Sequence, residues 1–199
     1  MNQLLFVKSS VFGDGGQSSQ LADRFIERWQ SHYSQSDLVV RDLISQPIAH
    51  FDMETITALS TDASERTAEQ KNRVALSDQL IAEVKQADAI LIAAPMYNFA
   101  VPSQLKAWFD QVARNGVTFK YTENGPVGLL EDKPVYILAT RGGQYHDAGL
   151  DYQVPWLKLI LGFVGLHNVK VVLAEGLNMS DAEKSIQSAQ QEIDSIQLS

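Results

Sequence analysis

Cysteine is absent from this chain of 199 residues. Its absence excludes disulfides, thiolate metal ligands and a cysteine nucleophile. Histidine is scarce as well, and the spacing of His32, His50, His146 and His167 matches no zinc motif. We therefore expect no metal site.

Long apolar runs and excess positive charge are also missing. No stretch approaches the ~20 apolar residues of a membrane-spanning helix, and no signal-peptide pattern is visible, so we expect a cytoplasmic protein without a membrane partner. The net charge of -8 disfavours nucleic acid. The glycosylation sequon at Asn178 is interpreted as a chance match, because that modification needs the secretory route. The length predicts a single domain over residues 1–199.

Apolar runs of strand length alternate along the chain with stretches of helical periodicity. The runs predict strands at residues 3–7, 37–41, 88–94, 133–140 and 169–176, and the longer stretches predict helices at 19–33, 68–86, 103–114, 154–165 and 181–197. The third and fourth runs are apolar almost throughout, which is typical of strands buried on both faces of a parallel sheet. This alternation predicts an α/β fold, an open parallel sheet with helices on both faces. Either the strand order 2-1-3-4-5 or the Rossmann order fits it.

Two of these helices begin with the pattern of a capping box, Thr67 with Gln70 and Ser180 with Glu183. Pro102 suits the first turn of a third helix. Two connections, residues 46–66 and 116–132, are long enough to act as binding loops, and surface decoration is the alternative.

Three loops should meet where the parallel strands end, which is where open α/β sheets bind ligands. The first is not a Walker loop, and it lacks the third glycine of a dinucleotide fingerprint because Ser18 stands there after Gly13 and Gly15. It leads into a helix near Ser18 and Ser19, where free backbone N–H groups and hydroxyls bind a monophosphate. A plain helix cap is the alternative.

The second and third loops suit a flat ring. Residues 96–99 read Met-Tyr-Asn-Phe, a thioether and two aromatic rings beside an amide. The alternative is that Met96 and Phe99 are ordinary core residues under the next helix, which is the commoner role of such side chains. In residues 140–143, Gly142 and Gly143 allow close backbone approach or a turn, and Arg141 faces either an anion or solvent. A phosphate at one loop and a flat ring across two others predict flavin mononucleotide (FMN).

The segments "GQSSQLAD", "AAPMYNF", "GVTFKYTENGPVGL", "TRGG", "LGFVG" and "AEG" then carry a specific resemblance. The chain resembles the bacterial FMN-dependent NADH azoreductases, within the flavodoxin-like NAD(P)H:quinone reductase family, over nearly its whole length. This resemblance implies a flavodoxin-like sheet of order 2-1-3-4-5 and a homodimer. One departure is Gly16, where family members often carry a bulkier residue.

The resemblance also implies the roles of individual residues. The FMN phosphate would contact Ser10, Gly16, Gln17 and Ser18. The isoalloxazine ring would contact Met96, Tyr97, Asn98 and Phe99. The pyrimidine edge of that ring would contact Thr140, Arg141, Gly142 and Gly143. Tyr121 and Phe163 would border the substrate space, in part across a dimer interface.

The implied reaction is a ping-pong reduction of quinones, or cleavage of azo compounds to amines. NADH or NADPH gives hydride to the flavin and leaves, and the acceptor then takes the electrons; an azo bond needs two such rounds. No side chain reacts covalently. His146 either assists as a proton donor or is a solvent-exposed loop residue.

Two other classes of protein are alternatives to an FMN-dependent reductase. A flavodoxin-type electron carrier would share the fold and FMN but pass single electrons to protein partners. A hydrolase is disfavoured, because the chain has no Gly-x-Ser-x-Gly nucleophile elbow.

Overall fold

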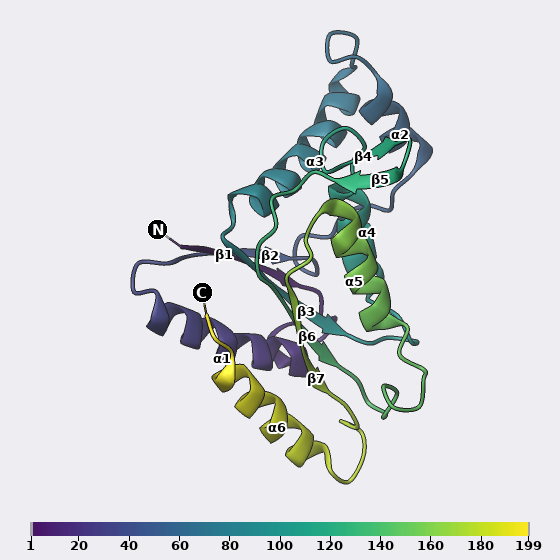
Figure 1. Cartoon of the computed structure of the whole chain (residues 1–199). Coiled ribbons are helices and arrows are strands. Elements are labelled where there is room, and N and C mark those ends of the chain that lie inside the picture. The colour runs from purple at the N-terminus through teal and green to yellow at the C-terminus, as the bar shows by residue number, and fades with distance from the viewer. Residues whose placement is uncertain (1, 199) are drawn as a thin grey trace.

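In the computed structural model, which describes residues 2–198, five parallel strands form one open sheet (Figure 1). The strands are β1 (Gln3–Lys8), β2 (Asp37–Asp42), β3 (Ala89–Pro95), β6 (Val135–Thr140) and β7 (Val169–Ala174). Their order across the sheet is β2-β1-β3-β6-β7, and every neighbouring pair is parallel. Counting these five strands alone, the order is 2-1-3-4-5, so the flavodoxin-like prediction is confirmed and the Rossmann order is wrong.

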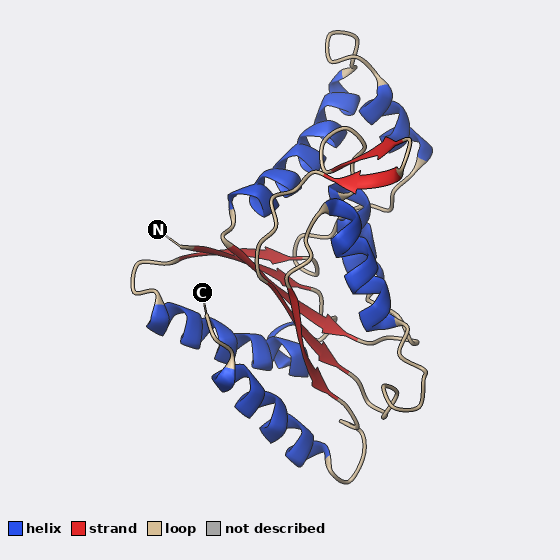
Figure 2. Cartoon of the chain, viewed as in Figure 1, coloured by secondary structure: helices blue, strands red, loops and turns tan. Residues whose placement is uncertain are grey.

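Helices cover both faces of this sheet (Figure 2). The α-helices of the described chain are α1 (Gln17–His32), α2 (Met53–Ser60), α3 (Ala68–Gln86), α4 (Ser103–Val112), α5 (Gln153–Val164) and α6 (Ala182–Ser195), of which α2 packs against α3. α1 and α6 lie side by side on one face, and α3, α4 and α5 lie on the other. Alternate residues of each strand feed the two apolar cores, so Leu4 and Phe6 pack toward α1 while Leu5 and Val7 pack toward the other face.

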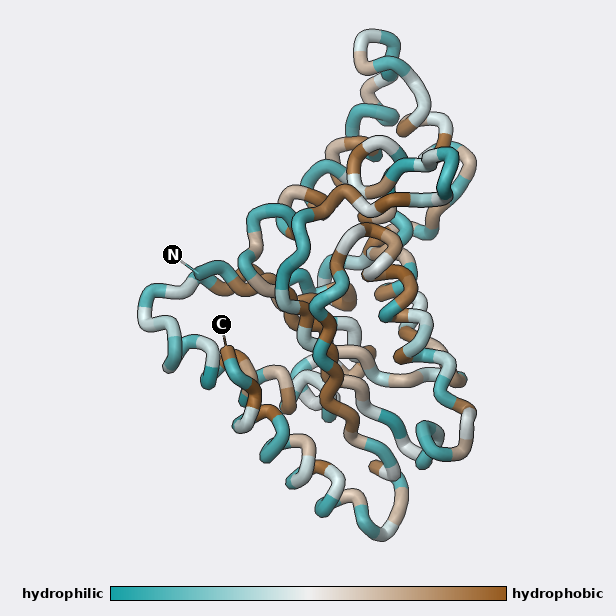
Figure 3. The backbone as a smooth tube through the Cα atoms, in the orientation of Figure 1, coloured by the Kyte–Doolittle hydropathy of each residue, from teal (hydrophilic) through white to brown (hydrophobic). Residues whose placement is uncertain are grey.

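The central strands are buried throughout, as their apolar runs predict. Every residue of β3 and β6 is buried, and the most apolar part of the backbone runs through the sheet (Figure 3). No helix within residues 2–198 is long and apolar enough to cross a membrane.

Three predictions about local structure need correction. The 46–66 connection contains α2, which Asp52 caps by accepting a hydrogen bond from Thr55 N (2.8 Å). The 116–132 connection contains an antiparallel hairpin of β4 (Phe119–Thr122) and β5 (Gly125–Gly128).

The third correction concerns the helix caps. The capping box at Thr67 and Gln70 is present. The one at Ser180 is not, because α6 begins a residue later, after a turn in which Ala182 N already donates to Met179 O (3.3 Å). Pro102 is likewise the N-cap of α4 and not part of its first turn.

Candidate cofactor site at the carboxyl edge of the sheet

The first loop ends at the start of α1 in a group of hydrogen-bonding atoms that have no partner among residues 2–198. α1 begins at Gln17 after the N-cap Gly16, whose carbonyl accepts from Ser19 N (2.9 Å), so the amides of Gln17 and Ser18 precede the helical ladder. Ser18 and Ser19 are buried, and within residues 2–198 neither hydroxyl has a hydrogen-bond partner. Because buried polar groups are normally satisfied, this end of α1 is short of an acceptor. A phosphate oxygen is such an acceptor, so the residues fit FMN here.

Gly16 is explained by space. A Cβ at this position would lie 2.1 Å from Ser10 Oγ and 2.8 Å from Ser10 Cβ. Ser10 is buried and accepts from Phe12 N (3.3 Å). The departure from the family pattern therefore matches the close approach of Ser10 to the start of α1.

The lysine that opens the first loop is already engaged. The Lys8 ammonium pairs with Asp14 at the loop tip and lies 3.7 Å from Asp42 Oδ2. Burial alone would lower the pKa of Lys8, but the hydrogen bond to Asp14 and the attraction of Asp42 outweigh it, and the pKa is raised. Lys8 thus balances carboxylates of this chain, and the free amides and hydroxyls are left to meet an anion.

The second loop is a tight hairpin turn. Tyr97 N donates to Ala100 O (3.0 Å) and Ala100 N to Tyr97 O (3.1 Å), and the two residues between them, Asn98 (φ 51°) and Phe99 (φ 64°), both have positive φ. This is the pattern of a type I′ turn, which bulky residues rarely adopt. Phe99 is 49% exposed, so it is not a core residue, and its ring packs edge-on against Tyr145.

The third loop lies against the segment that follows β7. Gly142 O accepts from Asn178 N (3.0 Å), and a Cβ on Gly142 would be 2.4 Å from Asn178 Nδ2. The loops after β3 and β6 also meet, because Met96 N donates to Thr140 O (2.8 Å). A side chain at position 142 would therefore require the Asn178 amide to move.

The side chain of Arg141 is shielded from solvent. It is fully buried (0% exposed), with Nη1 2.9 Å from Asp151 Oδ2 and 3.5 Å from Glu175 Oε1. Burial would raise the pKa of Asp151, but the hydrogen bonds from Arg141 and Val154 N and the charge of Arg141 lower it. Asp151 is therefore held ionised beside the guanidinium.

Two adjoining cavities lie along this edge of the sheet. The one beside the first loop, of about 240 Å³, is lined by Ser10, Phe12, Gly16, Gln17, Pro95, Met96, Tyr97, Thr140, Arg141, Gly142, Leu177 and Asn178. The larger one, of about 660 Å³, is lined by Tyr97, Asn98 and Phe99 together with the start of α4 and Trp156 of α5. They share Tyr97, whose hydroxyl accepts from Val11 N (3.2 Å). The structure thus brings residues from all three predicted loops together.

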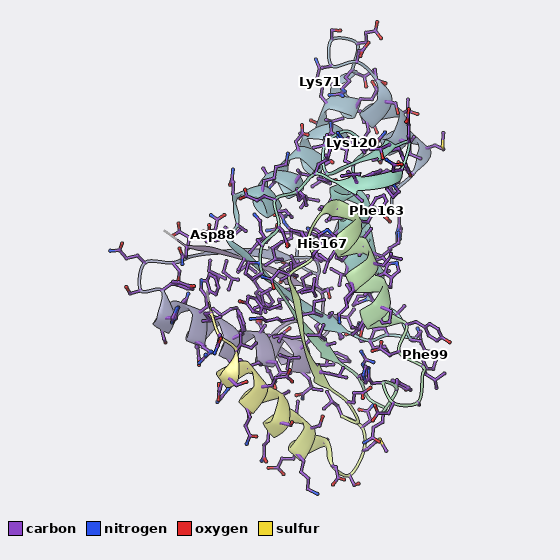
Figure 4. All side chains as sticks on the ribbon, in the orientation of Figure 1. Lys71, Asp88, Phe99, Lys120, Phe163 and His167 are labelled. Atoms are coloured by element: carbon purple, nitrogen blue, oxygen red, sulfur yellow. The ribbon has the colours of Figure 1, made fainter. Side chains whose placement is uncertain are left out.

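Five predicted residues line neither cavity: Ser18, Tyr121, Gly143, His146 and Phe163. Figure 4 shows Phe163 and Phe99 at opposite ends of α5. Phe163 packs on Phe119 of the hairpin with ring centroids 4.3 Å apart, and Tyr121 packs on the same ring at 5.6 Å. His146 is largely exposed, with Nδ1 3.5 Å from Asp151 Oδ2.

The fourth loop of the edge, after β7, was missed from sequence. It contributes Leu177 and Asn178 to the smaller cavity. The signal was available, because this loop also follows the carboxyl end of a parallel strand. In the sequence, Asn178 stands out only as part of a glycosylation sequon.

A nucleotide-sized cleft at the carboxyl edge of a 2-1-3-4-5 parallel sheet defines a flavodoxin-like protein. The family model described as "Flavodoxin-like fold" matches residues 2–196, and the chain belongs to this family. Its relatives include FMN-dependent NADH:quinone oxidoreductases from Cellvibrio japonicus, 52% identical over 98% of both chains, and from Vibrio vulnificus, 51% identical over 97% of both. Among solved structures, an FMN-dependent NADH-azoreductase from Bacillus anthracis in complex with FMN superposes with a TM-score of 0.89 at 25% identity, covering 98% of this chain and 96% of that one.

Proposed function

We propose that this protein is an FMN-dependent NADH:quinone oxidoreductase that also cleaves aromatic azo compounds. The observation that carries the proposal is the start of α1. There the Ser18 and Ser19 hydroxyls are buried with no partner among residues 2–198, beside the free amides of Gln17 and Ser18. The same activity is supported by relatives that are named FMN-dependent NADH:quinone oxidoreductases and share about half of their residues with this chain over nearly its full length.

In this proposal the phosphate end of FMN contacts Ser10, Gly16, Gln17 and Ser18. Hydrogen bonds to a charged group contribute about 1.5–3 kcal/mol each, and the dipole of α1 adds only about 0.3–1 kcal/mol, so amides and hydroxyls supply most of the affinity for the phosphate. That ranking explains why no free lysine is needed in the loop.

The ring end would lie between the Met96–Phe99 turn and the Thr140–Gly143 loop. Bound FMN supplies the two-electron redox chemistry. The protein contributes orientation, because Met96 and Tyr97 line the cavity from one loop while Thr140 and Gly142 line it from the other. Backbone N–H groups near Asn98 and Gly143 would stabilise negative charge at the ring edge. His146 remains a proposed aid to proton transfer.

We also propose a homodimer, a single FMN-binding domain over residues 1–199 and a cytoplasmic location, where NADH is available. The α5 face supports the dimer, because Leu159 is 71% exposed on it and the large apolar cavity opens beside it. The distance of Phe163 and Tyr121 from the cofactor cavity supports it too: a second copy would have to bring those rings to the substrate.

The proposed activity is tested by stoichiometry. The FMN-loaded protein, without oxygen and without any other protein, should oxidise one NADH per quinone reduced and two per azo bond cleaved, because an azo bond takes four electrons to give two amines. Free FMN and the apoprotein serve as controls. A holoprotein that oxidises NADH only when a separate reductase is added would be a flavodoxin-type carrier and would overturn the proposal.

A further inference from the structure

The buried charge of Arg141 calls for a physical reason, because the proposed reaction does not use it. Burying a guanidinium with a carboxylate costs several kcal/mol in desolvation, and a well-packed apolar replacement is often no less stable. Arg141 is nevertheless fully buried at the end of β6, directly before the two glycines of the third loop. What it contacts shows what the charge holds in place.

The first partner is Gln153, the buried first residue of α5. Its Oε1 accepts from Arg141 Nη2 (3.3 Å), and its Nε2 donates to Ala94 O (3.2 Å) and Pro95 O (2.9 Å) at the end of β3. The Gln153 amide therefore joins the guanidinium to the strand that leads directly into the Met96–Phe99 turn.

The other partners anchor this bridge. Asp151 pairs with Arg141 through Oδ2, and its Oδ1 accepts from Gln153 N and Val154 N, both at 3.1 Å. Glu175, after β7, accepts from Tyr145 N (2.8 Å) through the oxygen that faces Arg141. The loops after β3, β6 and β7 and the start of α5 are thus connected through one buried cation.

We propose that Arg141, Asp151 and Gln153 form a positioning network that sets the spacing of the two loops holding the isoalloxazine. Arg141 acts through Gln153 and through its own main chain, and not as a ligand of the cofactor. The network rests on the proposed function. It positions the loops beside the ring and does not act on the phosphate, which in that proposal is bound at the start of α1. Loss of the network should therefore weaken riboflavin and FMN equally.

The decisive variant is Gln153→Met, in which the methionine side chain has a similar volume but makes none of the hydrogen bonds of the Gln153 amide. Arg141 and Asp151 are left unchanged. Titration of apoprotein followed by flavin fluorescence should give dissociation constants for riboflavin and for FMN that both rise about tenfold, with a shifted absorption band of the bound ring. Gln111→Met is the matched control, because Gln111 is a buried glutamine of α4 outside both cavities. It should leave both constants within about twofold.

Arg141→Lys is the second variant, in case Gln153→Met does not fold. A lysine keeps the positive charge beside Asp151, but its single ammonium group lacks the second planar nitrogen with which Arg141 also contacts Gln153. This variant too should therefore weaken the binding of riboflavin and of FMN equally. If Arg141→Lys weakens binding while a folded Gln153→Met does not, Arg141 is a direct ligand and the network is wrong. If both variants bind riboflavin as the wild type does, the network is only structural. A wild-type protein that binds neither flavin would instead remove the proposed function.

Discussion

At the scale of single residues, the start of α1 holds hydroxyl groups that have no partner among the residues that the structure describes. The Ser18 and Ser19 hydroxyls are buried and unpaired among residues 2–198, whereas the nearby ammonium of Lys8 is fully paired. A site that binds an anion with hydroxyls and amides discriminates by geometry, because those donors are fixed by the start of α1.

This arrangement predicts the effect of removing hydroxyls. In the double variant Ser10→Ala, Ser18→Ala, the dissociation constant of FMN should rise about 10- to 100-fold for each lost hydrogen bond to the phosphate, and that of riboflavin should stay unchanged. Both constants come from fluorescence titration of apoprotein.

Ser77→Ala is the control for that experiment, since Ser77 is an equally buried serine that donates to Gln111 O (2.8 Å) away from the loop. It should change neither constant. Equal loss of riboflavin and FMN in the double variant would mean that the two serines support the loop and do not contact the phosphate.

At the scale of elements, the hairpin and α5 form a unit that the chain's pattern did not reveal. The last turn of α5 ends at Gly165 (φ 108°), and Leu130 N, just after the hairpin, donates to Val164 O (3.0 Å). A Cβ on Gly165 would lie 2.7 Å from Leu130 O. The hairpin is therefore seated on the end of α5 through a position that only glycine fills.

Two glycines of the same helix end should respond oppositely to alanine. Gly165→Ala should lower the free energy of unfolding by at least about 1–2 kcal/mol, because of the left-handed backbone and the contact with Leu130 O. Gly162→Ala should raise it by about 0.5–1 kcal/mol, since Gly162 is helical and its added methyl would meet only His167 at 3.5 Å. Urea unfolding measures both changes. Equal effects of the two substitutions would contradict this account of the α5 end.

The main elements were predictable because each carries its own local signal. The five apolar runs and the capping box at Thr67 depend on residues close together in sequence. α2 and the hairpin were missed because they are short, and what stabilises the hairpin is Phe163 of α5, a contact between residues 44 positions apart (163 minus 119). No local pattern encodes such a contact.

At the scale of the whole molecule, apolar surface gathers on one side. α5 exposes Leu159, and Tyr152 at its start is also largely exposed, next to the larger cavity. An exposed apolar face of this kind is typical of an interaction site. The proposed homodimer would bury it.

The dimer is tested by two matched substitutions. Leu159→Glu should convert the protein to a monomer in sedimentation equilibrium, because a carboxylate would have to be desolvated in the interface. Val40→Glu places the same charge at a 47% exposed position of β2 on the other face of the sheet, where its register partner Phe6 packs toward α1. This variant should remain a dimer. A wild-type chain that sediments as a monomer would contradict the proposal.

The sequence alone determined the alternation of buried strands and helices, because hydrophobic periodicity is a local property. It also determined that the loops after β1, β3 and β6 lie at the same edge of the sheet, because each follows the carboxyl end of a parallel strand. Only the tertiary structure decided that Arg141 turns inward to Asp151, that Asn178 closes the site from a fourth loop, and that Gly16 leaves room for Ser10. Each of these depends on side chains brought together from distant segments, and such packing is settled by the whole core at once.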